Sequence, residues 1–153
     1  MPLSDLSQWA TIAEALAVIV TLLLLIRQLG IANDANRGNA LIGVMQTLQD
    51  KETRKARGIL MSIQKPNLAD WSQEEIEAAE LACHGYDLVG IMAKNRLIRA
   101  APIASEWRDS IIKCWKNAHP LTEYRRKNWQ ADYWDDFETL YKLALKAEEE
   151  SRK

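Results

Sequence analysis

Apolar residues form one long run near the start of the chain, and shorter runs with helical spacing follow it. The long run covers residues 9–26, and its only charged residue is Glu14. With a rise of about 1.5 Å per residue, a helix of this length spans about 27 Å, close to the roughly 30 Å of a bilayer's hydrocarbon core. Trp9 and Arg27 suit the two interfaces. The pattern predicts one transmembrane helix over residues 9–28.

Two other interpretations of this run are less favoured. A signal peptide begins with basic residues, but residues 1–8 contain Asp5 and no lysine or arginine. No small-x-small cleavage motif follows the run before Arg27. A buried core helix needs more surrounding chain than remains to wrap it. A retained membrane anchor is therefore the preferred interpretation.

Basic residues flank the run on one side only. The N-terminal side carries Asp5 and no basic side chain, whereas the basic residues on the C-terminal side are Arg27, Arg37, Lys51, Arg54, Lys55 and Arg57. Because basic residues stay on the cytoplasmic side, residues 1–8 are expected outside and the rest in the cytoplasm. The sequence therefore predicts a single-pass protein of the inner (cytoplasmic) membrane.

The remaining chain keeps helical spacing and shows no alternating strand pattern. Residues 29–49 are expected to form a helical stalk, although the polar stretch 30–38 with its two glycines is either stalk or hinge. Residues 50–150 are expected to form a cytosolic helical domain. The predicted fold is all-α, with an N-terminal single transmembrane helix followed by a small bundle of about four to five helices.

Four helices are expected within the cytosolic domain. They cover residues 51–64, 72–97, 102–119 and 129–150. Ser72 and Glu75 form a capping box that marks the start of the second helix. Pro66 is expected to end the first, Pro102 to lie in the first turn of the third, and Pro120 to end it.

Apolar side chains on these helices predict the core. The second helix carries a packing face that includes Ala79, Cys83, Tyr86 and Val89, and a second strip of Leu81, Leu88 and Met92 that predicts a central position. The tryptophans at helical spacing are expected to be core residues rather than a ligand-stacking site; they are Trp107, Trp115, Trp129 and Trp134. Cys83 and Cys114 are expected to be buried thiols.

The chain offers little catalytic chemistry. Glu77, Glu80, His84 and Asp87 share one helical face, but the spacing Glu80-x-x-x-His84 differs from the Glu-x-x-His of di-iron bundles. A solvated polar face is the preferred interpretation, with no metal and no cofactor. A net charge of −1 argues against nucleic-acid binding. No phosphate-binding loop or nucleophile–base motif is recognisable, so an enzyme is not expected.

Two surfaces are candidates for contacts at the membrane. Small residues on one side of the transmembrane helix permit a helix–helix contact, with Glu14 paired or protonated; the residues are Ala10, Ala13, Glu14, Ala17 and Thr21. The alternative, which is equally favoured, is that Glu14 only reaches the outer headgroups and has no further role. Candidate contacts with anionic headgroups are Arg27, Lys51, Arg54, Lys55 and Arg57, although a solvated helix face explains the last four equally well.

Several segments resemble a bacterial family of small membrane proteins that has no assigned function. They are the helix end Leu25-Ile26-Arg27-Gln28, then Ala35-Asn36-Arg37, the stretch from Glu52 to Arg57, Ile59-Leu60, Tyr86 to Gly90, and the segment from Trp115 through Pro120 to Arg125. The resemblance implies a single-pass anchor and a helical cytosolic domain. It implies no catalytic residues. The glycine-bearing stalk departs from the family, in which a more basic segment is usual.

These observations predict a non-enzymatic, membrane-anchored interaction protein. Its expected partners are the bilayer and either the subunits of a bacterial membrane protein complex, in which it is an accessory or scaffold subunit, or copies of itself. The alternative is a homo-oligomer whose Glu14 side chains face the oligomer axis, as in a simple cation pore. A third hypothesis is a metal-dependent enzyme that uses Glu77, Glu80 and His84.

Overall fold

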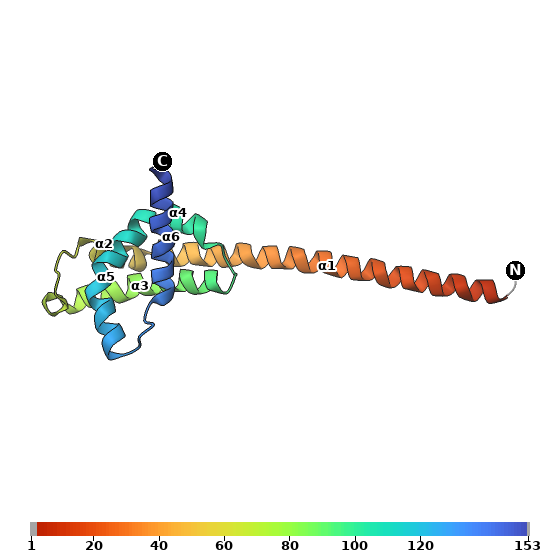
Figure 1. Cartoon of the computed structure of the whole chain (residues 1–153), viewed down its shortest axis with the longest axis horizontal. Helices are drawn as coiled ribbons and strands as arrows, with labels where there is room; N and C mark the ends of the chain where they lie inside the picture. The colour runs from red at the N-terminus through yellow and green to blue at the C-terminus, as the bar shows by residue number, and fades with distance from the viewer. Residues whose placement is uncertain (1–2, 153) are drawn as a thin grey trace. The chain divides into compact units, whose positions relative to one another are not determined.

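The computed structural model describes the backbone of residues 3–152 and the side chains of residues 13–152. Every regular element in this part of the chain is helical, which confirms the all-α class (Figure 1). The elements are α1 (Leu3–Gln49), α2 (Lys51–Ser62), the 3-10 turn η1 (Leu68–Asp70), α3 (Gln73–Lys94), α4 (Ala100–Glu106), α5 (Arg108–Asn128) and α6 (Asp135–Ser151). They belong to two compact units, the N-terminal unit Met1–Gly38 and the bundle unit Asn39–Lys153.

α1 is helical throughout the stretch that the sequence leaves open as stalk or hinge. Gly30 and Gly38 both lie inside the helix, although a glycine in a helix interior costs about 1 kcal/mol relative to alanine. The helix ends one residue before Asp50. The Asp50 side chain accepts hydrogen bonds from the backbone N–H groups of Glu52 (2.9 Å) and Thr53 (3.3 Å). This cap begins α2 immediately after the end of α1.

α3 starts where its capping box predicts. The Ser72 hydroxyl accepts a hydrogen bond from the N–H of Glu75 (3.2 Å), and the Glu75 carboxylate accepts one from the N–H of Ser72 (2.6 Å). The helix ends at Lys94 rather than near Leu97, because Arg96 adopts a left-handed backbone with φ 59°. The predicted end is therefore slightly too late.

The segment from Pro102 onward forms two helices instead of the single helix expected. α4 ends and α5 begins at Trp107, whose backbone departs from helical geometry (φ −101°, ψ 14°). α5 then continues through Pro120, where the sequence predicted its end. Proline removes one backbone hydrogen bond from a helix interior, but Ala118 and Leu121 on either side of it are buried in the core. This packing holds the helix together, and the predicted stop is wrong.

α6 begins at Asp135, later than the expected start at Trp129. A turn joins α5 to α6 and ends at Trp134, whose left-handed backbone (φ 59°) directs the chain into the last helix. Trp134 is buried, as predicted. Trp129 is 65% exposed, because the helical spacing that would place both rings on one face is interrupted between them. The predicted core position of Trp129 is therefore wrong.

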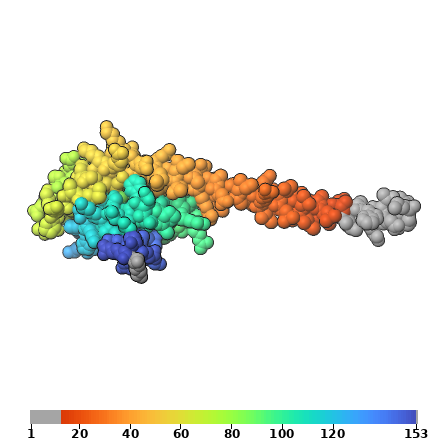
Figure 2. All heavy atoms as spheres, turned by 90° about the horizontal axis from the view of Figure 1, so that it is seen from above, coloured from red at the N-terminus to blue at the C-terminus, as the bar shows by residue number. Residues whose placement is uncertain are grey.

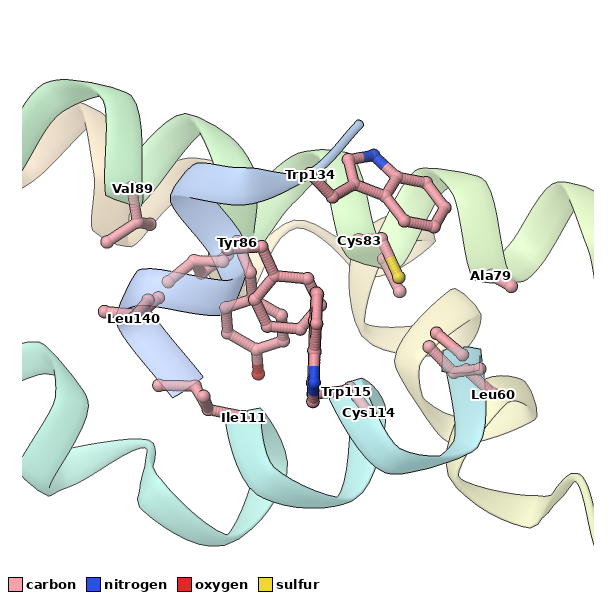
Figure 3. Close-up of a cluster of buried hydrophobic side chains, with 14 of the residues drawn as sticks. Leu60, Ala79, Cys83, Tyr86, Val89, Ile111, Cys114, Trp115, Trp134 and Leu140 are labelled. Atoms are coloured by element: carbon pink, nitrogen blue, oxygen red, sulfur yellow. The ribbon is translucent and has the colours of Figure 1, made fainter. Parts of the chain in front are cut away.

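Aromatic rings from α3, α5 and α6 fill the centre of the bundle unit, where Figure 3 shows Tyr86 and Trp115 among the buried side chains. The rings of Tyr86 and Phe137 stack with centroids 5.1 Å apart, and Trp115 meets Phe137 edge to face at 5.0 Å. The Tyr86 hydroxyl donates a hydrogen bond to Ser110 Oγ (2.7 Å), so its polar atom is paired inside the core. The predicted core positions of Tyr86 and Trp115 are confirmed.

α3 buries its predicted packing face but not its second apolar strip. Ala79 and Cys83 are fully buried, whereas Leu81 is 44% and Leu88 is 41% exposed. α3 nevertheless packs against α2, α4, α5 and α6, which agrees with its predicted central position, and Met92 of the second strip is partly buried against the core. The rest of that strip stays largely at the surface.

α6 approaches α3 closely at Gly90. A Cβ atom added there would overlap the backbone carbonyl group of Asp136. One turn earlier on α3, Asp87 Oδ1 accepts a hydrogen bond from the backbone N–H of Phe137 (3.0 Å). α3 therefore makes room for the first turn of α6 and also caps it.

Candidate functional site

The apolar segment of α1 is the most unusual surface of the molecule. From Ala13 onward the helix is long and apolar enough to cross a membrane, and none of its most apolar window is buried. The large apolar side chains from Leu16 to Ile31 are about half exposed or more (red to orange in Figure 2). A soluble monomer rarely exposes so large a contiguous apolar surface. This exposure differs from that of a core helix, most of which is buried, and fits the membrane span that the length and composition of the segment indicate.

The predicted helix–helix contact face lies on this segment. Ala13, Glu14, Ala17 and Thr21 are all exposed and lie toward one side of α1. The Thr21 hydroxyl donates a hydrogen bond to the carbonyl oxygen of Ala17 (2.8 Å), which satisfies its donor within the helix and leaves its oxygen available as an acceptor. The side chains of Trp9 and Ala10 lie outside the part that the structure describes.

The basic residues predicted to contact lipid fall into two groups. Arg27, Lys51, Arg54 and Lys55 are exposed, and Lys55 lies 3.7 Å from the carboxylate of Glu74. Arg57 is buried, with 6% of its surface exposed. A buried guanidinium cannot reach a headgroup, so the prediction for Arg57 needs correction. The lipid contacts of the other four stay a prediction.

Arg57 instead holds together the corner between α1 and α2. Its Nη1 donates a hydrogen bond to the carbonyl oxygen of Leu48 (2.5 Å), one of the last carbonyls of α1 that lacks a partner within the helix. The guanidinium carbon lies 4.7 Å from the centre of the Trp107 ring and 5.9 Å from that of Tyr86. The sequence contained a signal for this role, because Thr53 and Leu60 place Arg57 on the buried face of α2.

Residues on the polar face of α3 form more interactions within the bundle unit than the sequence predicts. Glu80 forms an ion pair with Arg125 of α5, and Asp87 caps α6. Burial raises the pKa of Asp87 above its ordinary value, although the hydrogen bond from the backbone of Phe137 opposes this rise. Glu77 and His84 remain exposed, as expected of a solvated face. Among residues whose side chains are described, no group of three or more His, Cys, Asp or Glu is placed to hold a metal ion.

The two cysteines are buried in the core, as predicted (Figure 3). Burial raises the pKa of the Cys114 thiol to about 11 and that of Cys83 well above its ordinary value. Because the thiolate is the reactive form of cysteine, both side chains are held in an inert state at neutral pH.

Comparison with protein-family models, with curated proteins and with solved structures gives no match. The resemblance to a bacterial membrane family therefore stays a prediction. The function has to be inferred from the exposed apolar helix and from the use that the bundle unit makes of its polar groups.

Proposed function

We propose that this protein is a non-enzymatic, single-pass membrane protein that acts as an accessory or scaffold subunit of a bacterial membrane protein complex. α1 anchors the chain in the inner membrane, with its N-terminus outside. The bundle unit lies in the cytoplasm and contacts partner subunits. The observation that carries the proposal is the exposed apolar surface of α1 between Leu16 and Ile31.

Three features support an interaction role over a catalytic one. Two carboxylates on the polar face of α3 are engaged within the fold, since Glu80 pairs with Arg125 and Asp87 caps α6. The thiols of Cys83 and Cys114 are buried. The bundle unit also exposes apolar side chains, among them Leu81 and Leu88 of the second apolar strip of α3. Exposed apolar side chains suit protein–protein contacts.

Contact between α2 and anionic lipid is a weaker part of the proposal. The part of α1 from Gln28 to its end at Gln49 has an axial length of about 32 Å. Attraction to a charged surface decays within a Debye length of about 8 Å at physiological ionic strength. Lys51, Arg54 and Lys55 would therefore reach headgroups only if α1 left the membrane at a steep tilt.

The proposal is tested by co-purification of the full-length protein from membranes in a mild detergent. We expect a native mass well above that of one chain in a micelle, with partner proteins present. Ala17→Leu should reduce the recovery of partners, because it fills a small position on the predicted contact face. Ala15→Leu is the matched control, since it lies about 200° around the helix from Ala17. Recovery only as a free monomer would contradict the proposal.

A further inference from the structure

The side of α3 that faces away from the core carries apolar side chains at helical spacing. Steps of four and three residues place five exposed side chains within about 80° of one another, opposite the buried Tyr86. They are here called the outer face of α3: Glu77, Leu81, His84, Leu88 and Ile91. Its three apolar members are between 39% and 44% exposed. The outer face is about 21 Å long, which suits a second helix that lies along it.

An exposed tryptophan lies beside the outer face. The ring of Tyr133 meets His84 edge to face, with centroids 6.3 Å apart, and meets Trp129 in the same way at 6.2 Å. Trp129 is 65% exposed, but it is held in place by Arg125, whose guanidinium carbon lies 3.8 Å from the ring centre. Arg125 is itself paired with Glu80. Tryptophan and arginine are enriched among the residues that dominate protein–protein binding, and a ring held in place before binding loses less entropy in a complex.

Opposite charges lie at the two ends of the outer face. Glu74 and Glu77 are exposed near the start of α3, and Arg96 and Arg99 are exposed just beyond its end. Among the side chains that the structure describes, Arg96 and Arg99 form no ion pair. Acidic side chains are favourable at the N-terminus of a helix and basic ones at its C-terminus. A partner helix with this common arrangement that runs antiparallel to α3 therefore places its acidic end beside the two arginines and its basic end beside the two glutamates.

A second copy of α3 has the same order of charges, but the membrane anchor argues against it. Residues 39–49 of α1 belong to the bundle unit, and they lie beside α3 and run in the opposite direction (Figure 1). Two α3 helices paired antiparallel would therefore receive their α1 helices from opposite ends. Two chains anchored in one membrane receive them from the same end, so a helix of a different subunit is the better occupant.

We propose that the outer face of α3 binds an amphipathic helix of another subunit that runs antiparallel to α3. This helix carries acidic residues at its N-terminal end, basic residues at its C-terminal end and an apolar stripe between them. The inference rests on the proposed function, because it names the surface through which the bundle unit contacts a partner. Contact along one helix buries less area than a standard interface. Anchorage of both chains in the same membrane offsets this, because it raises their effective concentration.

Binding of two synthetic helical peptides to the full-length protein in nanodiscs of neutral lipid tests the inference. Both peptides carry the same apolar stripe. The first has acidic residues in its N-terminal half and basic residues in its C-terminal half, and the second has these charges exchanged. Fluorescence anisotropy of a dye on each peptide, corrected for binding to empty nanodiscs, should show at least about tenfold tighter binding of the first.

Two variants locate the binding surface. Leu88→Gln should weaken the binding of the first peptide at least about fivefold, because it removes an apolar contact at the centre of the outer face. Ile42→Gln is the matched control, since it changes an exposed apolar residue of α1, and it should alter the affinity less than about twofold. Glu77→Lys combined with Arg99→Glu should reverse the preference, so that the second peptide binds more tightly than the first.

The outcomes separate this inference from the proposed function. Equal affinity for both peptides, binding of neither, or a preference that the charge exchange leaves unchanged would overturn the inference. A dimer of the full-length protein in detergent that Leu88→Gln converts to single chains would also overturn it, because a second copy would then occupy the outer face. All these results leave the anchor intact in a chain that resists alkaline extraction from the membrane. Release of the chain by the alkaline wash overturns the proposed function itself.

Discussion

Replacing Arg57 by alanine should lower the free energy of unfolding by about 2–4 kcal/mol. A hydrogen bond from a charged group, such as the one to Leu48, contributes roughly 1.5–3 kcal/mol. The stacking on Trp107 and Tyr86 adds about 0.5–2 kcal/mol, and each buried methylene of the stem about 0.8 kcal/mol. The cost of burying a cation offsets part of this sum. The net loss remains large because alanine also leaves the Leu48 carbonyl without its partner.

Urea unfolding of the full-length protein in detergent micelles measures this effect. The tryptophans of the bundle unit report the transition by fluorescence, and the denaturant midpoint should fall without a change in slope. Arg54→Ala is the matched control, since Arg54 is exposed on the same helix one turn earlier. It should change the free energy of unfolding by less than about 0.5 kcal/mol. Arg57→Lys should fall between the two, because a lysine lacks the planar fork.

Equal stabilities of the Arg57→Ala and Arg54→Ala proteins would refute this reasoning. Arg57 would then be a surface cation, as its charge alone indicates, and the corner between α1 and α2 would be held only by the Asp50 cap. A loss confined to Arg57 establishes that this corner depends on the guanidinium.

Two further substitutions and one chemical probe test the packing of the bundle unit. Gly90→Ala should destabilise the protein by about 1–3 kcal/mol in the same unfolding assay, because its Cβ would meet the backbone of Asp136. Gly58→Ala should instead stabilise it by about 0.5–1 kcal/mol, since its Cβ would enter open space on a helix; equal effects of the two would contradict the close approach. The thiols of Cys83 and Cys114 should react with a disulfide reagent at pH 8 at least about a hundredfold more slowly in the folded protein than in urea, and fast reaction of the folded protein would show that they are not buried.

Local signals predicted well wherever one interaction determined the structure. The capping box placed the start of α3 because both of its hydrogen bonds lie within four consecutive residues, Ser72 to Glu75. The face of α3 that includes Cys83 and Tyr86 followed from helical spacing, since an amphipathic helix buries its apolar side. The exposure of the apolar run in α1 fits the anchor that its length indicates.

Predictions failed where distant parts of the chain determined the outcome. Arg57 carries a charge and was assigned to the surface, but Leu48 and Trp107 supply a carbonyl and a ring that make its burial favourable. Pro120 is a local stop signal that is overridden by the packing of its neighbours. Trp129 fits the helical spacing of the residues that follow it. However, α6 begins only at Asp135, so the Trp129 ring does not lie on the core face of that helix. The helical spacing of α2 does place Arg57 on the buried face, but a single sequence does not show which distant carbonyl or ring offsets a local preference.

Cysteine labelling from the two sides of the membrane tests the central claim of a single-pass anchor most directly. Ser7→Cys lies in the segment expected outside, and Ser62→Cys lies at the exposed end of α2 in the bundle unit. In intact cells, a membrane-impermeant maleimide should label the Ser7→Cys protein, and it should label the Ser62→Cys protein only after lysis. Labelling of Ser62→Cys before lysis, or protection of both positions until lysis, would contradict the proposed anchor and its orientation.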